Sequence, residues 1–281
     1  MEIQHLTNFG ARGAKVRKRI KIVGLIAFHT FLIGIFLFNG LTVNAQEQER
    51  EINRAKIYDE IHPLLSETDL YCSIFVHETE IPSLRIVGSE REDERELISD
   101  GDVVYLNQGE KDGLAAGQLF LVYELSTNLP GYGHVAVKHG QARIQALSEN
   151  RSSATIEKSC GAVTLGNYLI PFREKETFMG KDEGYDVPPF EAKGLKGKVI
   201  YLQREFNQVG SGHWAVIDLG AEHGIQIGQQ LTLYRIVQEG APLQIFGNSV
   251  VIDVGKKTST IKVLSCRDAL RIGDLVQDKT S

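Results

Sequence analysis

The chain of 281 residues has little cysteine, methionine or tryptophan, with three, two and one residue respectively. Three cysteines without a Cys-x-x-Cys pair or a cysteine–histidine cluster give no spacing typical of a zinc site, and they are too few for a disulfide-framed mini-protein. Glycine shows no three-residue period, which excludes collagen. With 42% hydrophobic and 24% charged residues, the composition is that of a folded globular protein.

The chain also lacks an excess of positive charge, since 31 Lys and Arg stand against 36 Asp and Glu. Six basic residues and one acidic residue lie in residues 1–45, which leaves 25 basic and 35 acidic residues in 46–281, a net charge of −10. An acidic body repels the phosphates of nucleic acids. We therefore expect no nucleic-acid partner.

Only one long stretch, Ile22–Val43, carries no charge. A basic cluster precedes it and Val43-Asn44-Ala45 follows it, which is the order of a secretory signal peptide cleaved after Ala45. Twenty-two uncharged residues are also long enough for an uncleaved inner-membrane anchor, with membrane attachment through residues 22–43. Both interpretations place residues 46–281 in the periplasm or another extracytoplasmic compartment, and the choice between them stays open.

The three cysteines, Cys72, Cys160 and Cys266, are far apart in the sequence and odd in number. An exported protein can pair two of them, but the spacing does not say which. The simplest expectation is three buried free thiols.

An internal repeat organises the rest of the chain. Residues 84–109 align with 195–220 at an offset of 111, and the match resumes after a loop at an offset of 107. The paired positions include Gly113 with Gly224, Gly109 with Gly220, Tyr123 with Tyr234, Gly140 with Gly247, Ile156 with Val263, and Leu165-Gly166-Asn167 with Ile272-Gly273-Asp274. Two domains of one fold are the simplest explanation.

Each copy has the pattern of β-structure, because apolar residues alternate in short runs of Val, Ile, Tyr and Thr that are separated by glycine-containing turns. This pattern predicts a mainly β protein with two tandem small antiparallel β-barrel or sandwich modules. Gly113 and Gly224 are expected to be turn residues at positive φ, where a side chain is unfavourable.

The sequence divides into five parts on this basis. We expect a signal peptide or anchor (1–45), a helical and extended lead-in (46–83), module 1 (84–172), a linker (173–194) and module 2 (195–281). Within the lead-in, apolar residues alternate with charged ones over residues 47–66, which predicts a short amphipathic helix. The linker is charged and contains two adjacent prolines.

Both modules contain the string G-x-x-x-G-[LI]-x-x-G-x-x-[FL]-x-[LV]-Y, starting at Gly109 and Gly220. This string resembles a β-module of bacterial envelope proteins. It is found behind LysM peptidoglycan-binding units in exported proteins and in the C-terminal domain of the flagellar assembly protein FlgT, and it is more loosely similar to the paired β-barrels of the rod-shape protein MreC. The resemblance covers residues 84–172 and 195–278 and implies a structural role.

The chain departs from these families at three positions. Relatives usually carry Asp after the third glycine, where this chain has Gln118 and Gln229, and Asn167 replaces the Asp of the closing Gly-Asp pair in module 1. The sequence contains no LysM unit before the repeats, so the resemblance does not imply glycan binding.

Candidate chemical motifs are weak. The glycine series that starts at Gly109 lacks both the Gly-Lys-Ser/Thr of a Walker loop and the G-x-G-x-x-G spacing of a dinucleotide loop, so we interpret it as hairpin geometry. His134 and His139 lie in a long stretch that only module 1 has, and we expect a solvated loop there rather than a metal pair.

His213 and His223 occupy the repeat positions of Asp102 and Asp112, which indicates turn residues rather than catalytic ones. Ser211-Gly212-His213 lacks the G-x-S-x-G nucleophile elbow. We therefore predict no catalytic, cofactor-binding or metal-binding residues and no cofactor.

The resulting hypothesis is a non-catalytic exported envelope protein that acts as a scaffold or interaction module, with an envelope protein or peptidoglycan as its partner. The alternative is a carbohydrate-binding module that uses Tyr132, Tyr185 or Trp214, and an envelope hydrolase has the least support. A planar exposed cluster of these aromatic residues would favour glycan binding, whereas buried aromatic residues would favour a scaffold.

Overall fold

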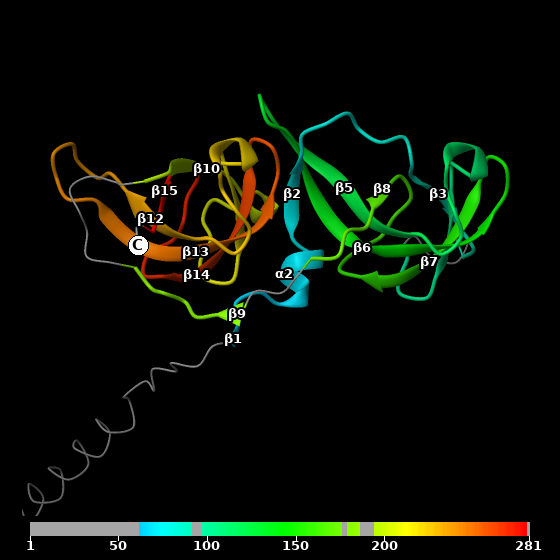
Figure 1. Ribbon diagram of the computed structural model, residues 1–281, viewed down its shortest axis with the longest axis horizontal. Coiled ribbons are helices and arrows are strands. Elements are labelled where there is room, and N and C mark those ends of the chain that lie inside the picture. The colour runs from blue at the N-terminus through cyan, green and yellow to red at the C-terminus, as the bar shows by residue number, and fades with distance from the viewer. Residues whose placement is uncertain (1–61, 92–96, 176–178, 186–193, 280–281) are drawn as a thin grey trace, which may run out of the picture. The chain divides into compact units, whose positions relative to one another are not determined.

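The structure is a computed structural model, and it describes residues 62–91, 97–175, 179–185 and 194–279. The expected signal or anchor segment lies outside these residues. Within them, every helix is too short or too polar to cross a membrane. The described chain is mainly β, as the sequence predicts (Figure 1).

Module 2, yellow to red in Figure 1, is a closed antiparallel barrel of six strands. The strands follow the order β10-β11-β14-β13-β12-β15, and β15 pairs with β10 to close the barrel. Their alternating β-branched residues fill the interior. The strands are β10 (Lys196–Leu202), β11 (Trp214–Ile217), β12 (Gln230–Arg235), β13 (Gln244–Val254), β14 (Ser259–Cys266) and β15 (Leu275–Asp278).

Module 1 has the equivalent strand order, β3-β4-β7-β6-β5-β8, around its own hydrophobic core. Its closing contact is shorter than that of module 2, because the two end strands meet through an isolated bridge between Arg85 and Tyr168. The strands are β3 (Ile86–Ser89), β4 (Val103–Leu106), β5 (Leu119–Leu129), β6 (Gly133–Leu147), β7 (Ser152–Ser159) and β8 (Tyr168–Pro171).

The strand positions confirm the repeat over most of its length. Strands β4 and β11 are offset by 111 residues, and β7 and β14 by 107. The first strand of each module is an exception, because Ile86 pairs with Leu106 as Val199 pairs with Ile217, an offset of 113 instead of the expected 111. The connection to the second strand is two residues longer in module 1.

The repeated glycines have two different structural reasons. Gly113 and Gly224 end short 3-10 turns, η1 (Glu110–Asp112) and η3 (Ala221–His223), at φ values of 85° and 80°. This confirms the expected positive φ. Gly109 and Gly220 are required by close packing instead, since an added Cβ would lie 2.2 Å and 2.5 Å from the nearest backbone oxygen of the next hairpin.

Only residues 62–66 of the expected helix over 47–66 are described, and they are not helical. Residues 47–61 lie outside the described residues, and the chain then forms β1 (His62–Pro63), which pairs with β9 (Met179–Gly180). The helix α2 (Glu67–Tyr71) follows the N-cap residue Ser66, whose side chain makes a capping box with Asp69. The lead-in then continues as β2 (Ile74–His77), which pairs with β6.

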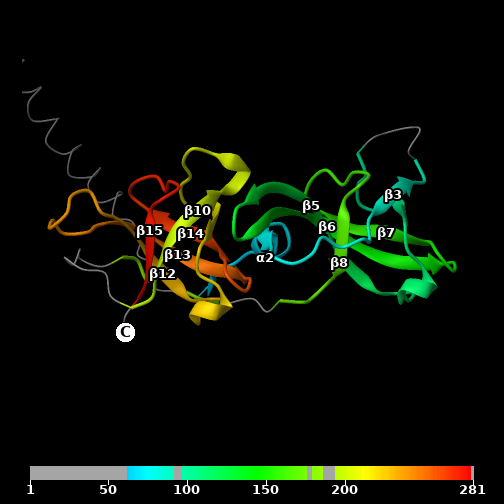
Figure 2. The ribbon, with the colours of Figure 1, turned by 90° about the horizontal axis from the view of Figure 1, so that it is seen from above.

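The hairpin of β5 and β6 is much longer than its counterpart in module 2, with strands of 11 and 15 residues against 6 and 11 (Figure 2). The expected loop around His134 and His139 is therefore wrong, because both residues lie within β6. Lys138 and the neighbouring glycines give this strand a loop-like composition, but its pairing with β2 adds a second partner strand that stabilises the extension.

Candidate functional site: the lead-in and the surfaces that hold it

The lead-in contacts both modules through apolar side chains. Ile74 and Val76 of β2 pack against Val135 of module 1 and against Tyr201 and Val216 of module 2. All five side chains are buried. The hydroxyl of Thr260 in β14 donates a hydrogen bond to the backbone oxygen of Ile74 at 2.9 Å, which fixes β2 on the β11–β14 surface of module 2.

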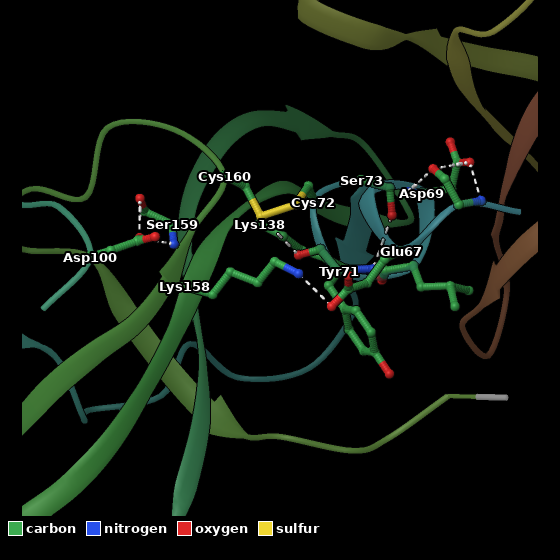
Figure 3. The surroundings of a disulfide bond; sticks show 12 residues. Glu67, Asp69, Tyr71, Cys72, Ser73, Asp100, Lys138, Lys158, Ser159 and Cys160 are labelled. Atoms are coloured by element: carbon green, nitrogen blue, oxygen red, sulfur yellow. Dashed lines mark hydrogen bonds and ion pairs between the residues drawn. A yellow bond between two sulfur atoms is a disulfide. The ribbon is translucent and has the colours of Figure 1, made fainter. Parts of the chain in front are cut away.

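A disulfide joins Cys72, at the end of α2, to Cys160, at the end of β7 (Figure 3). This corrects the expectation of three free thiols, because only Cys266 is unpaired in the described part of the chain. The ion pair between Lys158 and Glu67 lies beside the disulfide. The lead-in is thus covalently attached to module 1.

Asp69 connects α2 to module 2. Its carboxylate accepts hydrogen bonds from Trp214 Nε1 at 3.0 Å and from Lys262 Nζ at 2.6 Å, and only 4% of the residue is exposed. Burial alone would raise the pKa of Asp69, but the hydrogen bonds from Lys262, Ser66 and Trp214 outweigh it and hold the pKa below its ordinary value. The group is therefore a buried carboxylate that stays ionised.

A second buried ion cluster links the two modules. Lys138 of β6 donates to Asp253 of β13 at 2.7 Å, and to the backbone oxygen of Leu70 and the hydroxyl of Ser73 at 3.1 Å. Burial lowers the pKa of Lys138 to about 8, although Asp253 opposes the shift. Lys175, in the expected linker, also donates to Asp253, at 2.6 Å. The described part of the linker is therefore attached to module 2.

Glu78, the residue after β2, is held by a turn of module 2. The backbone N–H groups of Lys256, Lys257 and Thr258 donate to its carboxylate at 2.8–3.0 Å, and the Thr258 hydroxyl donates at 2.7 Å. Consecutive N–H groups that converge in this way form an anion-binding nest. The lead-in thus carries two carboxylates that module 2 recognises by different means.

Two cavities lie along this junction. One of ≈ 290 Å³ has Lys138 and Asp253 in its lining together with Phe75 and Phe172. The other, of ≈ 650 Å³, lies beside the disulfide and is lined in part by Tyr201, Arg204 and Trp214. Within the described residues, no three His, Cys, Asp or Glu side chains come together as a metal site.

The paired turn residues behave as the sequence predicts. Asp112 accepts the N–H of Gly109 at 2.9 Å, and His223 Nδ1 accepts the N–H of Gly220 at 3.0 Å. An Asp and a His thus perform the same capping function at equivalent positions. The glutamines at the equivalent position of the two repeats close their turns as well, since Gln118 accepts the N–H of Ala115, and Gln229 that of Gln226.

The histidines of β6 are separated by their partners. His134 lies opposite His77 in the strand register, whereas His139 contacts Glu124 at 3.1 Å. The Sγ of Cys266 lies 3.6 Å from the hydroxyl of Ser211. The structure therefore does not bring these residues together at one site.

The three aromatic residues proposed for glycan binding are half-buried. Tyr132 and Trp214 pack against the cluster around β2, and Tyr185 packs separately against Tyr234 and its neighbours with Arg267 over its ring. These three side chains form no common exposed plane.

Sequence reasoning missed Asp69, Glu78 and the Lys138–Asp253 pair. No repeat marks Asp69 or Glu78, because the lead-in occurs once, and the contacts join residues up to 193 positions apart. The sequence signal that could have found Asp69 is the Ser66-x-x-Asp69 capping pattern. In comparisons with known proteins, no family model and no curated protein matches this chain.

Proposed function

We propose that the protein is a non-catalytic, exported bacterial envelope protein that acts as a scaffold or interaction module. The observation that carries this proposal is the capture of the lead-in: β2 adds to the edge of β6, and Glu78 enters the nest on module 2. Strand addition with a pocket for selected side chains is a common mode of peptide recognition. The chain thus uses its two modules to hold an extended segment.

Export is supported by two independent features. The order of basic, apolar and small residues before Gln46 is that of a signal segment. The Cys72–Cys160 disulfide suits an oxidising compartment, because disulfides rarely persist in the cytosol. Cleavage after Ala45 and retention as an inner-membrane anchor both agree with these features.

Mass spectrometry of protein isolated from cells with thiols trapped tests the export proposal. We expect an N-terminus at Gln46 and a linked peptide pair that contains Cys72 and Cys160. An intact N-terminus in the membrane fraction, with the disulfide formed, would establish the anchor instead. A soluble cytoplasmic pool with all three thiols reduced would contradict export in either form.

The half-buried positions of Tyr132, Tyr185 and Trp214 favour protein interaction over glycan binding. A photo-crosslinking residue at the exposed positions Val237 and Leu165 in intact cells should give discrete protein adducts, with the charged exposed position Glu222 as the control. Cosedimentation with purified peptidoglycan tests the alternative. Sedimentation without any protein adduct would replace the proposed role with glycan binding.

A further inference from the structure

The cavity of ≈ 290 Å³ at the junction has apolar walls that the protein covers only in part. Its apolar lining includes Tyr71, Phe75, Leu121, Ile170 and Phe172. All five side chains are half-buried. Leu121 and Ile170 lie opposite each other on the outer face of β5 and β8, since their neighbours Val122 and Leu169 belong to the core of module 1. An apolar group in the cavity would remove their remaining surface from water.

The same positions of module 2 are polar. Leu121 pairs with Ile170 as Thr232 pairs with Gln277, in agreement with the repeat offsets of 111 and 107. Both modules have the same strand order, so this arrangement does not require apolar residues at the two positions. The apolar wall of the cavity is therefore a feature of module 1 alone.

A buried lysine forms the polar end of the cavity. Lys138 occupies the repeat position of Ile245, a buried apolar residue of module 2. The three protons of its ammonium group are used by the backbone oxygen of Leu70, the hydroxyl of Ser73 and the carboxylate of Asp253. Lys138 thus places a positive charge beside the apolar wall, but it has no proton left for a ligand.

Lys175 supplies the donors that Lys138 lacks. Its Nζ donates to Asp253 at 2.6 Å and, within the described residues, to no other acceptor, so two of its three N–H groups remain. Lys138 and Lys175 share the single carboxylate of Asp253, which leaves the cluster with a surplus of one positive charge. Arg173, which is exposed, adds a further positive charge to the lining. Because buried charges are normally paired, one negative charge would balance the cluster.

We propose that this cavity binds a small amphipathic carboxylate, a molecule with one carboxylate group and an apolar tail or ring. The carboxylate accepts hydrogen bonds from Lys175 Nζ, and the apolar part packs on Leu121, Ile170 and Phe172. A volume of ≈ 290 Å³ is at the lower end of small-molecule sites, which favours a small ligand. This site goes beyond the scaffold role proposed above and does not depend on it.

Isothermal titration calorimetry of the purified protein with sodium octanoate tests the site. We expect saturable binding of one octanoate per chain. Acetate lacks the tail and octan-1-ol lacks the charge, so each should bind at least about tenfold more weakly. Octyltrimethylammonium has the same tail with the opposite charge and should not bind.

Lys175→Met removes the ammonium group and should weaken octanoate binding at least about tenfold. Lys111→Met is the matched control, because Lys111 is an exposed lysine of module 1 that does not line the cavity, and it should bind octanoate as the wild type does. Leu121→Thr introduces the residue that module 2 has at position 232 and should weaken binding roughly threefold to tenfold. This variant retains the charged cluster and tests the site even if Lys175→Met fails to fold.

Three outcomes would overturn the proposal. The first is no binding at millimolar octanoate. The second is binding of octan-1-ol or octyltrimethylammonium as tight as that of octanoate, which would show an apolar cavity without selectivity for an anion. The third is equal weakening in Lys175→Met and Lys111→Met, which would place the ligand elsewhere. The titration uses purified protein and small molecules, so its failure would leave the export and crosslinking tests of the scaffold role unaffected.

Discussion

Modules 1 and 2 have the same strand order but different surfaces. Module 2 has the lead-in packed on β11 and β14 and a glutamate in its β13–β14 turn. Module 1 has an exposed tyrosine and an exposed turn at the equivalent place. The repeated features, such as the glycines of the 3-10 turns, maintain the shared strand arrangement, whereas the features that differ determine what each module binds.

The largest expected loss of stability among the variants that test this comparison comes from Glu78→Gln. A carboxamide nitrogen cannot accept hydrogen bonds, so part of the nest would lose its charged partner, at a cost of about 1.5–3 kcal/mol. Thermal unfolding should shift down by roughly 3–12 °C for a protein of this size. Hydrogen exchange at residues 256–258 should become as fast as at residues 149–151, which should exchange rapidly already in the wild type.

Glu80→Gln is the matched control, because Glu80 is exposed and lies two residues further along the same segment. It should change neither the melting temperature nor the exchange pattern. Equal exchange of the two turns in the wild-type protein would remove the distinction between the modules on which this expectation depends.

A smaller effect is expected from Gly113→Val and Gly224→Val. Nothing lies within 4 Å of an added Cβ at either position, so the cost comes from the positive φ alone and should be about 1 kcal/mol or more in both modules. Gly224→Asn should cost less, because asparagine tolerates the left-handed region. Unchanged thermal melts in both valine variants would contradict the hairpin interpretation.

The repeat allowed much of the fold to be predicted, because turn chemistry is local and leaves a pattern in the sequence. Gly113, Asp112 and Gln118 each act within a turn of a few residues, and their counterparts act in the same way. The polar residues and glycines of β6 have the composition of a loop. They form a strand because β6 extends beyond the rest of module 1 and has β2 as a second partner.

The site itself was not predictable by the same reasoning. Cys72 bonds a residue 88 positions away, and Glu78 is recognised by backbone atoms, which leave no side-chain pattern. Asp69 is marked only as a helix cap, although it also binds Lys262 and Trp214. Contacts between a unique segment and a repeated domain require the three-dimensional arrangement.

The smallest expected effect concerns the loss of stability at low pH. The folded-state pKa of Asp69 lies below its ordinary value of 3.8, so the folded protein binds fewer protons than the unfolded chain near and below pH 4. Its contribution to stability is complete above that range and is lost as the pH falls through the folded pKa. Melting temperatures at pH 7 and pH 3 should therefore differ less in Asp69→Asn than in the wild type.

Glu157 is the control for this pH dependence, because its pKa is also lowered, by the hydrogen bond from Arg143, but the pair lies on the exposed surface of module 1. Water and salt screen such a pair, so Glu157→Gln should leave the difference between pH 7 and pH 3 nearly unchanged. If Glu157→Gln reduced the acid sensitivity as much as Asp69→Asn, the acid response would come from surface charge rather than from the buried carboxylate that attaches the lead-in to module 2.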